Sequence, residues 1–216
     1  MVLLIQIIVT TIGLTIIGTF LWRVGSRHRE LPFPVWLRWM VELDNPFTKF
    51  NRAHTILEHA DLRPGMSVLD AGCGPGRLTI PAAKRVGPQG HVVAMDCQEG
   101  MLSRTKDKAQ SAGLSNIEFL QAGLGQGASG INRFDRALLV TVLGEIPERS
   151  RALKEISEAL RPGGILSVTE TIFDPHFQRR KTVSRLGADA GLLPINTIGS
   201  KTSFIMNFRK PGANDP

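Results

Sequence analysis

The hydrophobic and polar positions of the chain separate an apolar head from a longer mixed body. Residues 2–22 read VLLIQIIVTTIGLTIIGTFLW and contain no charged side chain. As a helix, this stretch would be about 31 Å long, the thickness of a bilayer's hydrocarbon core. A soluble core helix of this length would show a polar face, and a signal peptide would begin with basic residues and end at a small-residue cleavage site. Since neither pattern is present, residues 1–22 are predicted to form a transmembrane anchor.

Residues 23–50 are predicted to form a juxtamembrane amphipathic segment. The apolar positions of one short helix within it share a single face: Phe33, Trp36, Leu37, Met40 and Leu43. Tryptophan beside a membrane span favours the headgroup level. This face is therefore expected either to lie in the membrane interface or to cover the body as a lid, and a lid at the membrane surface would satisfy both expectations.

From residue 51 the pattern alternates between strand-like and helix-like segments. Strands are expected at residues 67–70, 91–95, 117–120, 134–142, 165–170, 192–198 and 203–208. Helices are expected at residues 51–60, 77–86, 100–112, 148–160 and 179–190. Strands separated by helix-length connections predict a doubly wound, Rossmann-like α/β sheet in a domain over residues 51–210. Residues 211–216 are predicted to form a flexible tail.

The composition fits a globular body with a hydrophobic core. Apolar residues make up 42% of the chain and charged residues 21%, which excludes a disordered or fibrous protein. The two cysteines, Cys73 and Cys97, do not form a C-x-x-C pair. A disulfide scaffold and a cysteine-ligated zinc site are therefore excluded, and no metal site is predicted.

The net charge of +7 favours an anionic partner, either membrane headgroups or nucleic acid. Nucleic acid is the poorer expectation, because tyrosine is absent and aromatic and basic residues do not alternate. Basic residues follow the apolar head but do not precede it, so the positive-inside rule places the body in the cytoplasm. A second basic run, residues 179–181 with Arg185, is either a solvated helix face or a contact with the anionic leaflet.

The clearest chemical signal is a glycine-rich turn after the first strand of the body. Residues 68–76 read VLDAGCGPG, so a strand runs directly into Gly72, Gly74 and Gly76. Glycines in such a turn tolerate positive φ and let the backbone pass close to a ligand. The next strand ends at Asp96, where a carboxylate can bind the ribose hydroxyls of an adenosine.

Two features distinguish this turn from a nicotinamide dinucleotide site. The dinucleotide pattern needs a glycine at the position that Arg77 occupies. Asp70, two residues before Gly72, would place a negative charge near a pyrophosphate. The same charge suits the ammonium and sulfonium groups of S-adenosylmethionine, which is therefore the predicted cofactor.

The segments VLDAGCGPG, VVAMD, FDRALLV and ALRPGGILSVTE together resemble the class I S-adenosylmethionine-dependent methyltransferases. The chain is most similar to the group around the ubiquinone/menaquinone C-methyltransferases and their membrane-associated relatives. The resemblance covers about residues 50–210 and implies a seven-stranded sheet with the last strand antiparallel. It also implies a cofactor at the carboxyl ends of the first strands, with the ribose at Asp96 and the methionine part at Asp70, Gly72 and Gly74.

One position departs from the family's pattern. An acidic residue that binds the adenine amino group often follows the third strand, but Gly123 stands there and leaves the backbone of Leu124 to bind the ring. Losing one such hydrogen bond costs about 0.5–1.5 kcal/mol, which weakens cofactor binding without abolishing it. The full set of predicted cofactor-binding residues is Asp70, Gly72, Gly74, Gly76, Asp96, Cys97, Gly123, Leu124 and Thr141.

A base for the reaction is expected where the family's acceptor pocket opens, after the fourth and fifth strands. The cofactor itself brings the electrophilic methyl group, so the protein orients the reactants and accepts a proton where the acceptor needs it. Glu145, Glu170 and His176 are the catalytic candidates. For each, the alternative is a structural role: a surface or helix-capping carboxylate for the two glutamates, and a solvated loop residue for His176.

These features predict a membrane-anchored, cytoplasm-facing methyltransferase that binds the lipid bilayer and methylates a lipid-like acceptor. An isoprenoid quinone precursor and a phospholipid amine are examples of such an acceptor. Two alternatives remain open. The anchor can serve only for location while the enzyme methylates a small soluble or thiol acceptor, or the protein can bind S-adenosylmethionine as a regulator without turnover.

Overall fold

The computed structural model describes residues 6, 10, 13 and 48–212 of the 216-residue chain. The predicted transmembrane anchor and the juxtamembrane helix lie outside the described residues, apart from three isolated positions in the anchor. Among the residues that the structure describes, no helix is both long and apolar enough to cross a membrane.

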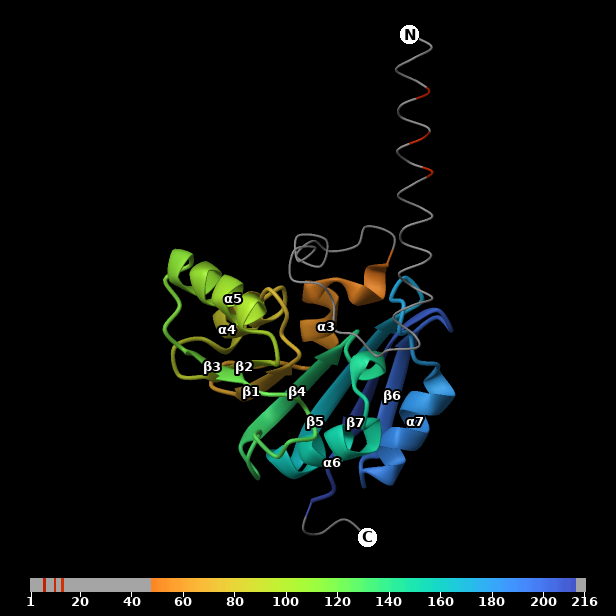
Figure 1. Cartoon of the computed structure of the whole chain (residues 1–216). Coiled ribbons are helices and arrows are strands. Elements are labelled where there is room, and N and C mark those ends of the chain that lie inside the picture. Colours follow the sequence, from red (N-terminus) through yellow and green to blue (C-terminus); the bar gives the residue numbers. More distant parts are fainter. Residues whose placement is uncertain (1–5, 7–9, 11–12, 14–47, 213–216) are drawn as a thin grey trace.

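The body is built on one seven-stranded sheet with the strand order β3-β2-β1-β4-β5-β7-β6 (Figure 1). Its strands are β1 (Ser67–Ala71), β2 (His91–Asp96), β3 (Ile117–Gln121), β4 (Phe134–Val140), β5 (Leu160–Thr171), β6 (Leu193–Gly199) and β7 (Ser203–Arg209). Neighbouring strands from β3 to β5 pair in parallel, whereas β7 is antiparallel to both β5 and β6. The predicted Rossmann-like sheet with an antiparallel last strand is confirmed.

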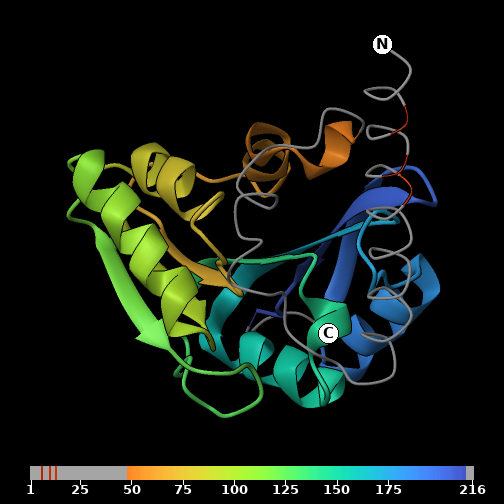
Figure 2. The same cartoon turned by 45° about the horizontal axis from the view of Figure 1, so that its top comes forward.

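Helices cover both faces of the sheet (Figures 1 and 2). They are α3 (Ala53–His59), α4 (Thr79–Val86), α5 (Glu99–Ser111), α6 (Arg149–Ala159) and α7 (Arg180–Asp189), with short 3-10 turns η2 (Lys49–Asn51) and η3 (Leu143–Glu145). Helices α3, α4 and α5 pack on one face and α6 and α7 on the other. Because both faces are covered, the central strands β1, β2 and β4 are buried at nearly every position.

Strand β5 begins earlier than the sequence indicates. Residues 161–164, RPGG, are expected to close the preceding helix as a turn, but the structure includes them in β5. The pairing with β4 is irregular at this point, because Leu160 lies opposite Phe134 and Ile165 lies opposite Arg136. The turn-forming residues are thus absorbed as a bulge, in which Gly163 adopts a φ of +80°.

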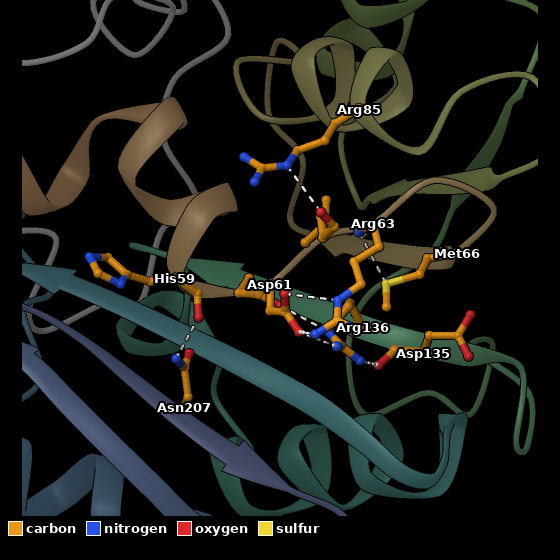
Figure 3. A network of polar contacts seen from close by, with 10 residues as sticks. His59, Asp61, Arg63, Met66, Arg85, Asp135, Arg136 and Asn207 are labelled. Carbon is orange, nitrogen blue, oxygen red and sulfur yellow. Dashed lines mark hydrogen bonds and ion pairs between the residues drawn. The ribbon is translucent and has the colours of Figure 1, made fainter.

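The connection from α3 to β1 is fastened to the sheet by polar contacts (Figure 3). The Arg136 side chain of β4 donates to the carbonyl of Ala60 at 2.8 Å, and Asn207 of β7 donates to the carbonyl of His59 at 2.8 Å. From α4, Arg85 donates to the carbonyl of Leu62 at 3.0 Å. These contacts satisfy carbonyls at the end of α3 and fix this helix over the strands that carry the site.

Candidate functional site

The glycine turn follows β1 and has the conformation that the sequence predicts. Gly72, Gly74 and Gly76 have φ angles of +74°, +52° and +79°. A Cβ at Gly72 would lie 2.5 Å from Cγ2 of Val142, so the backbone of the turn packs directly on the segment that follows β4. A Cβ at Gly74 would meet nothing within 4 Å. The turn is therefore tightly packed at Gly72 and open at Gly74, where a ligand can approach the backbone.

Asp70 lies buried at the end of β1, directly before this turn. Its side chain accepts a hydrogen bond of 2.6 Å from the hydroxyl of Thr79. Burial raises the pKa of Asp70 to about 6, although the Thr79 bond and the charge of Arg77 both act to lower it. A buried carboxylate with a raised pKa lacks a full counter-charge, and a cationic ligand group over the turn would supply one.

Asp96 connects the ends of β1 and β2. Its two carboxylate oxygens accept hydrogen bonds of 2.9 Å, one from the backbone N–H of Gly74 and one from that of Gln98. Burial raises the pKa of Asp96, and these backbone bonds oppose the rise. The carboxylate is held across the open side of the glycine turn, and its remaining acceptor positions suit the two hydroxyls of a ribose.

The two cysteines beside this turn differ in environment. Cys73 is buried, and burial together with the charge of Asp70 raises the pKa of its thiol well above the ordinary value. Cys97 is exposed, and partial burial and the neighbouring Asp96 raise the pKa of its thiol. Neither thiol is activated as a nucleophile, and Cys97 lies at the rim of the predicted ribose site.

The loop after β3 is held by a residue that the sequence analysis missed. The Glu155 carboxylate of α6 accepts backbone hydrogen bonds from Gly125 at 2.6 Å and Gly127 at 3.0 Å, and it also accepts from the backbone N–H (2.9 Å) and the hydroxyl (2.6 Å) of Ser129. Burial acts to raise the pKa of Glu155, but these bonds outweigh it and lower the pKa. The loop that carries the predicted adenine-binding residues Gly123 and Leu124 is thereby fixed.

Gln126 also belongs to the predicted adenine side of the site. Its side-chain oxygen accepts a 3.2 Å hydrogen bond from the backbone N–H of Gly123. A Cβ at Gly123 would lie 3.0 Å from the Gln126 side-chain nitrogen, so the amide occupies the space beside this glycine. Gln126 offers a polar group where the family often has an acid, which the sequence analysis did not recognise because Gln126 stands three residues further on.

Thr141 lies where the chain turns from β4 into η3, between the glycine turn and the predicted catalytic residues. It is a non-glycine residue with a φ of +54° directly after β4, and its backbone N–H donates to the carbonyl of Thr169 at 2.9 Å. This left-handed conformation turns the chain sharply into η3. It places Val142 against Gly72, so Thr141 shapes the predicted cofactor site through the backbone.

The structure brings the three catalytic candidates together. The Nδ1 atom of His176 lies 3.8 Å from Oε1 of Glu145 and 3.9 Å from Oδ1 of Asp174. Glu170 accepts a 2.9 Å hydrogen bond from the backbone N–H of Gln178 through one oxygen, while its other oxygen is buried without a partner among the described residues. Burial, together with the charges of Asp174 and Glu145, raises the pKa of Glu170 well above its ordinary value. We call Glu145, Glu170, Asp174 and His176 the acid–histidine cluster.

Residues outside the predicted set brace this cluster. Arg149 donates to the carbonyls of Leu143 at 3.1 Å and Gly144 at 2.9 Å, which fixes η3 and therefore Glu145. Asp174 accepts from the backbone N–H of His176 at 2.6 Å, and Gln178 donates to the carbonyl of His176 at 2.6 Å. Their roles depend on contacts between loops, which leave no local pattern in the sequence.

The glycine turn and the acid–histidine cluster are parts of one site. A Cβ at Gly144 would clash with the carbonyl of His176, so η3 lies directly against the loop after β5. The charge of Glu145 contributes to the raised pKa of the Cys97 thiol, which places this glutamate near the predicted ribose position. All nine predicted cofactor-binding residues lie on the loops and strand ends at the carboxyl edge of β1 to β4. Their roles in binding stay predictions.

This sheet order, glycine turn and carboxylate after β2 define the class I methyltransferase type of Rossmann-like fold. The chain belongs to the methyltransferase domain family, whose model matches residues 62–190. The expected enzyme class and the expected cofactor, S-adenosylmethionine, agree with this membership.

Curated relatives match about half of the chain. A demethylmenaquinone methyltransferase of Bacillus cereus is 35% identical over 111 residues, which cover 51% of this chain and 47% of that protein. The ubiquinone/menaquinone biosynthesis C-methyltransferase UbiE of Vibrio vulnificus is 32% identical over 117 residues, 52% of this chain and 45% of that protein. The matched part is thus about half the length of these relatives.

A solved structure supports the fold over a larger part of the chain. The crystal structure of an S-adenosylmethionine-dependent methyltransferase from Aquifex aeolicus superposes with a TM-score of 0.74 at 22% identity. The superposition covers 83% of this chain and all of the other. At this level of identity the likeness concerns the fold.

Proposed function

We propose that this protein transfers a methyl group from S-adenosylmethionine to a lipid-like acceptor at a membrane surface. The observation that carries the proposal is that residues 142–144 pack against both the glycine turn, where Val142 meets Gly72, and the acid–histidine cluster, where Gly144 meets His176. A cofactor site that adjoins a buried set of proton-accepting groups suits methylation of an acceptor that must lose a proton. The relatives are named demethylmenaquinone methyltransferase and ubiquinone/menaquinone biosynthesis C-methyltransferase, which supports a lipid-like acceptor such as an isoprenoid quinone precursor. A phospholipid amine is the other candidate of this class.

Each residue of the site has a distinct task in this proposal. S-adenosylmethionine supplies the electrophilic methyl group. Asp70 balances the charge of the methionine part, Asp96 accepts from the ribose hydroxyls, and the loop fixed by Glu155 borders the adenine. Because burial raises the pKa of Glu170, its neutral form is favoured, and we assign the base to Glu145 or His176. Glu170 instead braces the loop through Gln178.

The membrane part of the proposal rests on the uncharged stretch of residues 2–22. An acceptor confined to a bilayer is met most efficiently by an active site that is held at the same surface, because tethering raises the local concentration. The basic residues that follow the stretch favour a cytoplasm-facing body.

Full-length protein in membranes, incubated with radiolabelled S-adenosylmethionine and a total lipid extract, tests this function. We expect the label in a product that partitions into the organic phase. Label only in added soluble or thiol acceptors would favour a methyltransferase with a soluble substrate. Cofactor binding without transfer to any acceptor would favour a non-catalytic regulator. A protein in which Glu145→Gln and His176→Asn are combined should bind the cofactor and lose transfer.

A further inference from the structure

Two large apolar side chains are exposed side by side on the loop that follows β5. Ile172 is 43% exposed and Phe173 is 57% exposed. Together they form an exposed apolar spot on this loop, and removing it from water would be favourable. The pair lies only two to three residues from Glu170 and His176, so it borders the acid–histidine cluster.

The loop that carries this pair is firmly held. The backbone N–H of Ile172 donates to the carbonyl of Thr202 in the β6–β7 turn at 2.7 Å, and the N–H of Asp174 donates to the carbonyl of Thr171 at 2.9 Å. The loop ends where the N–H of Gln178 meets the Glu170 carboxylate. The exposure of Ile172 and Phe173 is therefore a feature of a braced loop, which presents both side chains outward.

Basic residues lie on the two segments next to the apolar pair, the start of α7 and the β6–β7 turn. Arg179 at the start of α7, Lys181 in its first turn and Lys201 in the β6–β7 turn are exposed, and within residues 48–212 no ion pair involves them. Arg180 donates to the carbonyls of Gly199 and Ser200 at 2.7 Å, which joins the start of α7 to the β6–β7 turn. The cations therefore gather at one end of the molecule.

At the start of α7, the charges of Arg179 and Lys181 do not stabilise the folded protein. The first turn of α7 contains no acidic residue, and cations at a helix N-terminus are opposed by the helix dipole. Asp174, the acid in this loop, has a mostly buried side chain beside His176. It therefore does not neutralise the exposed charges of Arg179, Lys181 and Lys201. An external anionic surface would complement this arrangement.

The described chain also begins at this end. Phe50 of η2 packs at the β6–β7 turn, since a Cβ at Gly199 would lie 2.9 Å from its ring. Figure 1 shows η2, the β5–α7 loop and the β6–β7 turn at the same end of the molecule. The described chain therefore begins near the β6–β7 turn, to which the backbone of Ile172 is bonded.

We infer that Ile172 and Phe173, with Arg179, Lys181 and Lys201 on the adjoining segments, form a docking surface that inserts into the interface of an anionic bilayer. An aromatic and an aliphatic side chain among cations match the two zones of such an interface, acyl chains and phosphates. The inference deepens the proposed function and rests on its membrane location. Docking here would hold the loop that borders the acid–histidine cluster against the bilayer, which shortens the way of a lipid acceptor to the site.

Photocrosslinking of the full-length protein tests this surface. The protein is reconstituted in vesicles that contain phosphatidylglycerol and a diazirine-bearing phosphatidylcholine, and crosslinked peptides are mapped by mass spectrometry. We expect lipid adducts on Ile172 and Phe173, at least fivefold fewer adducts in vesicles without phosphatidylglycerol, and a decrease with salt. The absence of adducts on this loop, or a number of adducts that does not depend on lipid charge, would overturn the inference.

Two matched pairs of variants separate the surface from unspecific effects. Combining Arg179→Glu, Lys181→Glu and Lys201→Glu should reduce the adducts on Phe173 at least fivefold, whereas Arg185→Glu, on the same helix but paired with Asp189 at 3.0 Å, should not. Phe173→Ser should reduce adducts on Ile172, whereas Ile131→Ser, at a 72% exposed residue elsewhere, should not. Equal effects within either pair would contradict the surface. Calorimetric binding of S-adenosylmethionine confirms that each variant is folded.

Methyl transfer to lipid, measured in the same vesicles, distinguishes this inference from the proposed function. Transfer without loop adducts would disprove the docking surface and leave the function standing. Loop adducts without transfer to any acceptor would disprove the function and support the surface.

Discussion

Asp70 is a buried acid, and its raised pKa makes the folding stability of the protein without cofactor depend on pH. The pKa rises from 3.8 to about 6, so the folded state holds this proton more tightly than the unfolded state does. Folding stability therefore decreases as the pH rises from about 4 to about 6, and the penalty is complete above about pH 6. A cofactor that places a cation beside the carboxylate would remove this penalty.

The variant Asp70→Asn tests whether the charge of Asp70 lowers folding stability. An asparagine oxygen still accepts the Thr79 hydrogen bond but carries no charge. Without cofactor at pH 8, we expect the variant to be more stable by about 2–3 kcal/mol, from about 1.4 kcal/mol per pKa unit. The gain should vanish at pH 4, and S-adenosylmethionine should bind more weakly. Thermal unfolding at both pH values and calorimetric titration measure these effects, and an equal gain at pH 4 would refute the assignment.

Asp96→Ala tests the ribose position. The change removes two charge-assisted hydrogen bonds to the ribose, about 3 kcal/mol, so affinity for S-adenosylmethionine should fall more than a hundredfold. It also frees the backbone N–H groups of Gly74 and Gln98. Calorimetric titration compares it with Asp107→Ala, which removes the same charge from the exposed face of α5. Unchanged affinity in Asp96→Ala would show that the ribose is bound elsewhere.

At the scale of single residues, the sequence reveals functional residues whose partners lie close to them in the chain. The glycine turn and the acid at the end of β2 are recognisable because strand, turn and carboxylate follow one another at fixed spacing. Glu155 has no such signal, because its partner Gly125 stands 30 residues away and its own segment resembles an ordinary amphipathic helix. Arg149 and Gln126 were missed for the same reason: each acts through contacts that only the folded loops create.

The elements of the body follow from hydrophobic periodicity to within a few residues, and the differences are local. The expected helix at residues 51–60 is divided into η2 and α3, and the end of the expected strand at 134–142 turns into η3. In both places the chain leaves a regular element to reach the site. Periodicity cannot report such corners, because they are imposed by packing against other segments.

The loop between β3 and β4 depends on α6 for its shape, and Glu155→Gln tests this dependence. A glutamine has one acceptor oxygen, so it cannot serve the donors from Gly125, Gly127 and Ser129 together. We expect unfolding free energy to fall by about 1–3 kcal/mol at pH 7. Because the folded pKa of Glu155 is lowered, its stabilisation is complete above the unfolded value of 4.5 and is lost as the pH falls through the folded pKa.

The difference between the two proteins should therefore shrink below about pH 4.5 in thermal unfolding. Glu158→Gln, an exposed position on the same helix, is the matched control and should have little effect. A difference that stays constant down to pH 3 would mean that the ionised carboxylate is not what holds the loop.

At the scale of the whole molecule, the described residues 48–212 build a hydrophobic core around the sheet. Its hydrophobic clusters, with the partly buried side chains packed against them, unite β1 to β5 and β7 with α3 to α7, whereas β6 is largely exposed. The alternation of strand and helix segments in the sequence predicts the fold class and the helices on both faces of the sheet. The strand order follows only from the family resemblance, because periodicity does not tell which strands are neighbours.

The hydrophobic core of residues 48–212 predicts the effect of removing Met1 to Trp22. The shortened protein should fold and bind S-adenosylmethionine with unchanged affinity. Methylation of a bilayer-embedded acceptor should fall much more than methylation of the same acceptor in detergent, because the stretch supplies local concentration rather than chemistry. Parallel assays on vesicles and micelles measure both. Equal losses, or failure to fold, would show that the stretch belongs to the catalytic body.

The left-handed corner at Thr141 joins the two halves of the site through packed backbone, from Gly72 to Val142 and from Gly144 to His176. A ligand that steadies one half steadies the other, so we expect cooperativity between cofactor and acceptor. Thermodynamic linkage makes it reciprocal: the factor by which S-adenosylmethionine tightens a quinone analogue must equal the factor by which the analogue tightens S-adenosylmethionine. Paired titrations measure both factors, and Val142→Ala, which loosens the corner, should bring both toward one.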